Sequence, residues 1–319
     1  MNKTILYGNG MNYHPNTASD SVTWGDLLKD IMNGQSFETD FLPNTMSYER
    51  IRLNWNRNKH SLPHLKQRIT ELLNNQPANP YYEEILKMDC ENYITTNYDY
   101  AINKTFLDLG NKYPETQNNS EELYSIRRNS FLINNQNEIK KIWNIHGELN
   151  HPKSIMLGLN HYCGSIGKID AYLKGTYDFK YKGQKNDIKK IEDKLKQEQY
   201  DGYSWIELIF NSNLHIIGFG LDFSEIDLWW LLTKRARLFE KGLIKNTVSF
   251  YTKPLGEIEE KISNEKDEHK RRIQIVKFET ELRKIETLKD LNVEIKEVSS
   301  TKGYSEYWKQ IFETINTCS

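Results

Sequence analysis

Asn-Tyr-Ile-Thr-Thr-Asn-Tyr-Asp, residues 92–99, joins an apolar segment to a polar loop. The β-branched and aromatic residues of its first half predict a strand, which ends at Asn97. Beyond the loop, Ala101, Ile102 and Phe106 recur at the spacing of one helix face. A strand followed by a polar loop and a helix is the repeating unit of parallel α/β sheets, so this order of elements predicts that class.

The same unit recurs elsewhere in the chain, with a glycine-containing loop directly after an apolar strand. These strands and loops are 4–7 with Gly8-Asn9-Gly10, 141–145 with His146-Gly147, and 214–217 with Gly218-Phe219-Gly220. Further strands are predicted over 247–252 and 293–298. The alternation of strands and helices predicts a Rossmann-like, doubly wound parallel sheet, in which ligands bind beyond the carboxyl ends of the strands.

The whole chain, 1–319, is expected to form one domain in three parts. Residues 1–40 and 89–255 are expected to form the Rossmann-like core. Residues 41–88 have apolar positions at helical spacing between prolines, which predicts an inserted helical lobe. Residues 256–319 are expected to form a helix and strand extension that packs on the core and ends in an amphipathic helix over 304–315.

Three other segments have less specific patterns. A first helix is expected from Trp24, with Thr23 and Asp26 as its N-terminal cap. Residues 108–140 are polar and predict a surface excursion or a second helical element. The charged run 180–199 predicts a solvated helix or the margin of a lid.

Composition excludes several classes of function. The 43 basic and 44 acidic residues give a formal charge of -1, which offers no general attraction to nucleic acid or to anionic lipid. No apolar stretch approaches the roughly 20 residues needed to cross a bilayer, and no secretory signal is evident, so we expect a cytoplasmic protein. Cys90, Cys163 and Cys318 are far apart, so neither a disulfide framework nor a structural metal site is expected.

Each motif taken alone has a simpler structural interpretation. Gly8-Asn9-Gly10 is the first half of a dinucleotide fingerprint, but Tyr13 stands where a third glycine would be, and the motif also suits an ordinary tight turn. Asn97 or Asp99 would equally serve as a helix N-cap. His146 has an alternative role as a hydrogen-bonded turn residue. The loop from Gly218, with its downstream carboxylates Asp222 and Asp227, has an alternative as a plain strand-to-helix turn.

The order of the motifs is more specific than any one of them. Thr-Asn-Tyr-Asp at 96–99 followed by His146-Gly147, between two Gly-x-Gly loops, resembles the sirtuin superfamily. In particular, it resembles the divergent branch of bacterial SIR2-like proteins associated with phage defence. The resemblance spans about residues 5–238, although few residues within it match. It implies a Rossmann-like NAD domain with an inserted helical lobe.

The resemblance also implies roles for individual residues. The catalytic residues would be Asn97, His146 and Asp99, with His146 as the base. Thr96 would line the nicotinamide-ribose pocket together with Asn97 and Asp99. The other implied NAD-binding residues are Gly8, Asn9 and Gly10 near the phosphates, Gly218 and Gly220 on the adenosine side, and Asn12 and Asp227.

Departures from the sirtuin deacylases favour hydrolysis over deacylation. Those enzymes have an alanine in the first glycine turn, a glutamine before the asparagine and a four-cysteine zinc ribbon. This chain has Asn9 and Thr96 at the two positions and no cysteine pair. We therefore expect an NAD+ hydrolase that uses NAD as substrate and requires no metal, and that acts as the effector subunit of an anti-phage abortive-infection system. The alternatives are a catalytically silent NAD or ADP-ribose binding subunit, an NAD-dependent protein deacylase and a conventional dehydrogenase.

The chemistry of cleaving the nicotinamide bond suggests a role for each expected catalytic residue. Breaking the nicotinamide bond leaves positive charge at the ribose C1′ carbon, so Asn97 would fix a water or the ribose hydroxyls beside it. His146 would accept a proton from that water or from a hydroxyl at neutral pH. Asp99 would orient Asn97 or stabilise the positive charge.

An unregulated hydrolase would exhaust the NAD of its own cell, which predicts a control on activity. We expect little room for a separate sensor domain, because the first strand lies at the start of the chain and about 80 residues follow the last motif. We therefore expect a homo-oligomer, a separate sensor or activator protein of the same defence system, or both. The 41–88 segment and the C-terminal segment are the expected contact surfaces. Neither a membrane nor a nucleic acid is an expected partner.

Overall fold

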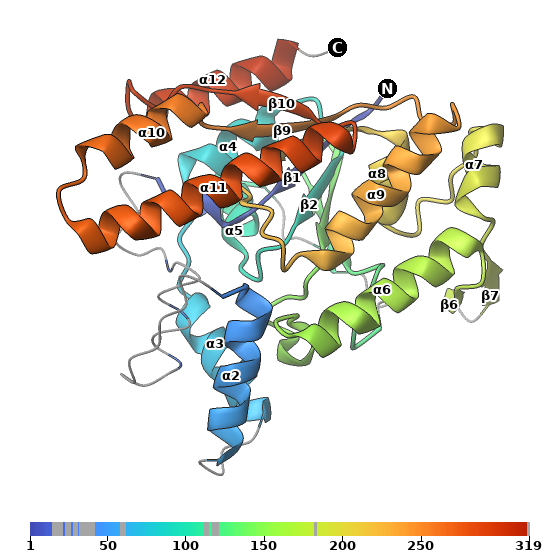
Figure 1. The fold of residues 1–319 in the computed structure, drawn as a ribbon. Coiled ribbons are helices and arrows are strands. Elements are labelled where there is room, and N and C mark those ends of the chain that lie inside the picture. Colours follow the sequence, from blue (N-terminus) through green and yellow to red (C-terminus); the bar gives the residue numbers. More distant parts are fainter. Residues whose placement is uncertain are drawn as a thin grey trace.

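An eight-stranded sheet forms the centre of the protein (Figure 1). The computed structural model describes residues 1–14, 22, 27, 31, 42–57, 62–111, 115–116, 121–181 and 184–317. The strand order is β10-β9-β8-β1-β2-β5-β4-β3, and the strands from β10 to β5 are parallel to one another. The predicted Rossmann-like, doubly wound parallel sheet with an inserted helical lobe is therefore confirmed.

The bounds of the elements follow the predicted alternation. The strands of the main sheet are β1 (Lys3–Tyr7), β2 (Asn92–Thr95), β3 (Glu115–Thr116), β4 (Asn129–Ile133), β5 (Ile139–Asn144), β8 (Asn213–Ile217), β9 (Val248–Thr252) and β10 (Glu294–Glu297). The helices are α2 (Asn44–Arg57), α3 (Leu62–Leu73), α4 (Pro80–Lys87), α5 (Ala101–Asp108), α6 (Leu159–Lys174), α7 (Ile191–Gln197), α8 (Ile206–Asn211), α9 (Ile226–Glu240), α10 (Leu255–Asn264), α11 (Glu268–Asp290) and α12 (Tyr304–Thr317).

Successive strand residues point to opposite faces of the sheet and enter two different hydrophobic clusters. In β1, Ile5 and Tyr7 belong to one cluster and Leu6 to the other. The cluster around Leu6 contains buried residues of α6, α7, α8, α9 and α11. The cluster around Ile5 contains buried residues of α4, α5 and α12. The central strands are buried on both faces, as expected of a parallel sheet.

The connections place a topological switch point between β1 and β8. From β1 the chain continues to β2 and then β5 on one side, and it later returns to β8, β9 and β10 on the other side. At such a point the loops after the two strands diverge and leave a crevice beyond their carboxyl ends. The loops at this point are Gly8-Asn9-Gly10 and Gly218-Phe219-Gly220.

Glycine is required here because the two loops are in contact. The Gly10 amide donates to the Gly218 carbonyl at 2.7 Å, and the Gly8 amide donates to the Ile217 carbonyl at 3.2 Å. A Cβ atom on Gly10 would lie 2.7 Å from the Gly218 carbonyl oxygen, which is far inside van der Waals contact. Gly218 also has a φ of 56°, a conformation that other residues rarely adopt.

Helices α2 and α3 form a lobe that projects from the sheet (Figure 1). Their apolar residues form a third cluster with Leu149, Ile155 and Leu157 from the segment after β5. The buried amine of Lys66 on α3 ties the lobe to this segment by donating to the Lys153 and Ile155 carbonyls. Within the range 41–88, α4 instead packs against the sheet.

Two polar segments differ from their predicted structure. Part of the 108–140 segment forms β3 and β4, which pair antiparallel at the edge of the sheet. β6 (Asp178–Tyr181) and β7 (Gln184–Asp187) pair antiparallel, and α7 follows them in the chain. Lys194 on α7 is fully buried and forms ion pairs with Glu207 and Asp201, so this helix is not simply solvated.

In the extension predicted over 256–319, α10 and α11 are followed by β10, which matches the strand predicted over 293–298, and by α12, which matches the closing helix predicted over 304–315. Thr23, Trp24 and Asp26 lie outside the described residues, so the cap predicted for the first helix does too. Among the helices that the structure describes, none is long and apolar enough to cross a membrane.

Substitution by alanine is expected to have opposite effects at a glycine in the loop contact and at a glycine on an open helix face. Gly10→Ala should destabilise the protein by about 1 to 3 kcal/mol because the new methyl group overlaps the Gly218 carbonyl. Gly167→Ala, on an open face of α6, should stabilise it by about 1 kcal/mol because alanine favours helix. Urea unfolding of both variants measures the difference, and a neutral Gly10→Ala would show that the two loops do not touch.

Candidate active site

A cavity of about 250 Å³ lies at the switch point, beyond the carboxyl ends of β1, β2, β5 and β8. The three predicted catalytic residues, Asn97, Asp99 and His146, all line it. Of the predicted NAD-binding residues, those that also line it are Asn9, Gly10, Thr96, Gly218 and Gly220. Gly8, Asn12 and Asp227 are not among its lining residues. Four loops that are far apart in sequence therefore meet around one cavity.

A hydrogen-bonded cluster of amides forms one side of the site. The Tyr82 hydroxyl donates to Asn12 Oδ1 at 2.6 Å, and Asn97 Nδ2 lies 3.5 Å from the same hydroxyl. The Asn12 side chain donates through Nδ2 to Asn9 Oδ1 at 2.8 Å and to Asp99 Oδ2 at 3.0 Å. Asn12 therefore connects the glycine loop after β1 to the loop after β2.

Both carboxylate oxygens of Asp99 have hydrogen-bond donors. Its Oδ1 accepts the Ala101 amide at 2.9 Å at the start of α5, although the N-cap residue of that helix is Tyr100. Its Oδ2 faces Asn12 in the amide cluster. Burial raises the pKa of Asp99 above its usual value, although the hydrogen bonds to its carboxylate oppose this effect.

His146 is placed by a sharp turn after β5. The chain reverses at Gly147, which has a φ of 100°, and a Cβ atom there would overlap the Ser154 carbonyl. The Met156 amide then donates to the His146 carbonyl at 2.9 Å. The turn buries the imidazole, which is only 2% exposed, while leaving it at the wall of the cavity.

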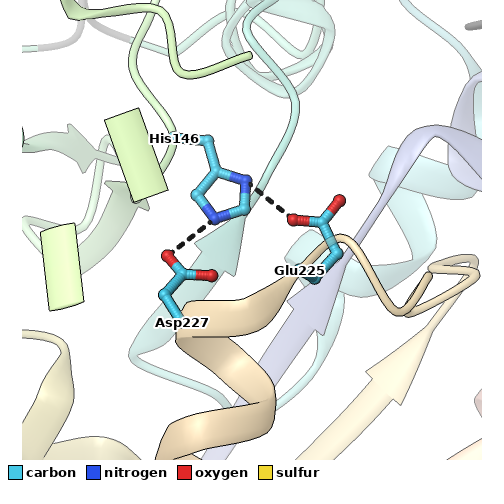
Figure 2. A group of neighbouring side chains, drawn as sticks. All are labelled: His146, Glu225 and Asp227. Atoms are coloured by element: carbon cyan, nitrogen blue, oxygen red, sulfur yellow. Dashed lines mark hydrogen bonds and ion pairs between the residues drawn. The ribbon is translucent and has the colours of Figure 1, made fainter. Parts of the chain in front are cut away.

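Two carboxylates flank the imidazole on different edges (Figure 2). Asp227 Oδ2 lies 3.1 Å from Nε2, and Glu225 Oε2 lies 3.5 Å from Nδ1. Asp227 is fully buried, and its other oxygen accepts the Leu228 amide at 2.9 Å. Both acids come from the start of α9, so the loop after β8 supplies them to the histidine after β5.

Burial and neighbouring charges shift the pKa values of His146 and Glu225. Burial opposes the charged form of His146, but Asp227 and Glu225 outweigh it and raise its pKa above the usual value. Burial raises the pKa of Glu225 to about 6, partly offset by attraction to His146. The Tyr162 hydroxyl donates to Glu225 Oε2 at 2.7 Å and favours the ionised carboxylate.

His146, Glu225 and Asp227 are also the group of described residues in which a metal ion could find three ligands, because their ligand atoms lie within 4.8 Å of one another. Ligands of one ion must converge on a common point. Here the two carboxylates approach different nitrogens of the ring, so hydrogen bonds already account for the arrangement (Figure 2).

Three residues that the sequence did not indicate belong to this site: Tyr82, Tyr162 and Glu225. Tyr82 and Tyr162 lie on helices whose pattern signals only burial, so no local signal distinguishes them. Glu225 had a signal, because it precedes Asp227 by two residues just beyond a strand and a glycine loop. Asp227, expected to bind the cofactor, contacts His146 and lies outside the cavity lining.

The His146–Asp227 pair predicts a pH-dependent loss of stability in Asp227→Asn. A raised histidine pKa contributes stability below the usual value of about 6.5, and this contribution is lost as the pH rises through the folded-state pKa. Asp227→Asn should therefore cost about 1 to 3 kcal/mol at pH 5.5 and clearly less at pH 9, measured by urea unfolding. Ser165→Ala, which removes an uncharged partner of the same carboxylate, is the control and should show no such pH dependence. A cost that is equal at both pH values would contradict the ion pair.

Comparison with known proteins bears on the same region. A family model described as SIR2-like domain matches residues 91–295, which include the loops after β2, β5 and β8. A search of curated proteins found no match to the chain. The matched range contains Asn97, His146, Glu225 and Asp227, and members of this family use NAD. The match covers more than half of the chain's 319 residues, so the chain belongs to the SIR2-like domain family.

Proposed function

We propose that this protein hydrolyses NAD+ at the bond between nicotinamide and ribose, releasing nicotinamide and ADP-ribose. One observation carries the proposal: Asn97 and His146, from different strands, line the same cavity at the switch point of an NAD-using fold. Glycines 10, 218 and 220 line that cavity as well and let a ligand approach the backbone closely. NAD is the substrate in this proposal.

The reaction places two demands on the protein. The C1′–N1 bond breaks with its electron pair moving to nicotinamide, which leaves neutral and needs no proton from an acid. Positive charge then develops at C1′ until water adds there and loses a proton. The protein must therefore orient the water and supply negative charge or a proton acceptor beside it.

The amide cluster suits the first demand. Hydrogen bonding through Tyr82 and Asn12 restrains the Asn97 side chain, and the backbone amide of Asn97 donates to Thr95 Oγ1 at 3.0 Å. With Nδ2 directed to Tyr82, the carboxamide oxygen is available to a water or a ribose hydroxyl. A restrained polar group of this kind lowers a barrier because little reorganisation is needed when charge develops.

The histidine cluster suits the second demand. It holds two carboxylates and one imidazole in a space with little exposure to solvent. Charge interactions are stronger in such an environment than in water. The cluster can therefore stabilise positive charge at C1′ and take up the proton that the water loses.

Replacing the central residues tests this function. Asn97→Ala and His146→Ala should each reduce the rate of nicotinamide release at least about 100-fold, because Asn97 orients the water and His146 belongs to the charged cluster that takes up its proton. Both side chains come from loops, so the sheet should still form. The measurement is chromatographic quantification of nicotinamide and ADP-ribose from purified protein with NAD and no acylated peptide.

Lys196→Ala, exposed on α7, is the matched control and should retain the wild-type rate. Melting curves establish that each variant is folded. Wild-type rates in folded Asn97→Ala or His146→Ala would remove the assignment. NAD binding without turnover in the wild type would favour a silent binding subunit, and turnover only with an acylated peptide would favour deacylation.

We further propose that the hydrolase is the effector of an anti-phage abortive-infection system and that its activity is controlled by assembly. The support is the resemblance of the motif order to defence-associated SIR2-like proteins and the harm that constant NAD loss would cause a cell. The controlling contact would be a second copy of the chain or a sensor protein of the same system. The lobe formed by α2 and α3 and the segment from α10 onward are the proposed surfaces.

Control by self-assembly predicts that activity depends on protein concentration. The rate per mole of chain should rise at least several-fold over the range in which light scattering shows the mass increasing, because only the assembled form is active. If the purified chain shows no assembly, adding the sensor protein should raise the rate instead. A fully active, isolated monomer would contradict this control.

A further inference from the structure

We propose that Glu225 is a further catalytic residue, whose carboxylate accepts the proton of the water that attacks C1′. This inference rests on the NAD hydrolysis proposed above and names the group that completes it. Glu225 lies at the start of α9, one residue before its first residue Ile226, and no feature of the motif order assigns it a role.

The two carboxylates that flank His146 differ in their exposure to solvent and in whether they line the cavity. The Glu225 side chain is 15% exposed and lines the cavity, whereas the Asp227 side chain is 0% exposed and does not line it. A water or ribose hydroxyl in the cavity can therefore reach Glu225 and cannot reach Asp227. Of the two acids, Glu225 is the one that can touch substrate.

The two oxygens of Glu225 have different partners. Oε2 accepts the Tyr162 hydroxyl at 2.7 Å and faces His146 Nδ1 at 3.5 Å. Oε1 receives no hydrogen bond from any residue that the structure describes, and Figure 2 shows one carboxylate oxygen pointing away from the imidazole. One oxygen is thus held by the protein, and the other is available to a proton donor in the cavity.

The neighbouring histidine is poorly suited to accept the proton itself. Asp227 holds its Nε2 at 3.1 Å, and the two carboxylates together favour the charged imidazolium. An imidazolium has no lone pair with which to accept a further proton. His146 instead holds Glu225 in place and keeps its carboxylate ionised, which makes His146 a positioning residue in this proposal.

The step balances in atoms and charge. The C1′–N1 bond of NAD+ breaks, and its electron pair leaves on nicotinamide. The water oxygen forms a bond to C1′, and the water proton moves to Glu225 Oε1. That proton then passes to solvent, so NAD+ and water give nicotinamide, ADP-ribose and one released proton.

Several groups on other elements determine how Glu225 titrates. Those that face it electrostatically are His146 after β5, Tyr162 on α6, Tyr98 after β2, and Asp222 and Asp227 close to it in the chain. Burial, Asp227 and Asp222 raise the pKa of Glu225, whereas His146 and the Tyr162 hydroxyl lower it, and the resulting pKa is about 6. A carboxylate with this pKa is mostly ionised at neutral pH and is still basic enough to accept a proton there.

The deciding experiment compares pH profiles of nicotinamide release. Wild-type kcat should fall as the pH drops through about 6, because protonation of Glu225 removes the acceptor. Glu225→Gln keeps the shape of the side chain and should lower kcat at least about 100-fold, with KM changed less than about threefold and the acidic decline gone. Glu240→Gln, exposed at the far end of the same helix, should leave both unchanged.

Tyr162→Phe provides a second measurement that does not depend on how well Glu225→Gln folds. Without the donated hydrogen bond, the ionised carboxylate is less stable, so the acidic decline should move to higher pH while activity at pH 8 is largely kept. A merely structural role for Glu225 would leave the position of this decline unchanged.

The outcomes separate this inference from the function on which it rests. If the wild type releases no nicotinamide, the proposed hydrolysis fails and the role of Glu225 fails with it. If the wild type is active and folded Glu225→Gln has the same kcat and acidic decline, only the role of Glu225 is overturned. An acidic decline that does not move in Tyr162→Phe overturns it as well.

Discussion

The contact between the loops after β1 and β8 is the constraint on which the cavity depends. Hydrogen bonds from Gly8 and Gly10 to the Ile217 and Gly218 carbonyls hold the two strand ends together at the switch point, where the order of the strand connections reverses. Only glycine fits at Gly10, because any side chain would meet the opposite carbonyl. The glycines hold the two loops in contact. Gly10 and Gly218 also form part of the cavity wall that a nucleotide would face.

Residues from two polar clusters of different chemistry line this cavity. The neutral cluster around Asn97 is held by Tyr82 and Asn12, and it is suited to orienting a small molecule. The charged cluster around His146 carries an excess of negative charge in a buried setting. In the proposed reaction, the second cluster would stabilise positive charge at the sugar carbon, and a water held by the first cluster would attack that carbon.

Much of the fold was predictable because each strand ends in a distinctive loop. Strand character before Gly8, Asn97, His146 and Gly218 fixed both the class of sheet and the edge at which the site lies. The pairing of β3 and the burial of Lys194 were not predictable, because the partners that satisfy these polar groups are distant in sequence. The site shows the same limit, since the three predicted catalytic residues and five of the predicted NAD-binding residues line the cavity, while Tyr82 and Tyr162 join the site only through tertiary contacts.

The central claim is that the cavity converts NAD+ and water into two products. Proton NMR of NAD incubated with the purified protein tests it most directly, because the nicotinamide and ribose anomeric signals are resolved in one spectrum. The account predicts free nicotinamide and ADP-ribose appearing together in equal amounts as NAD disappears. NAD that stays intact while bound, or nicotinamide released without an equal amount of ADP-ribose, would contradict it.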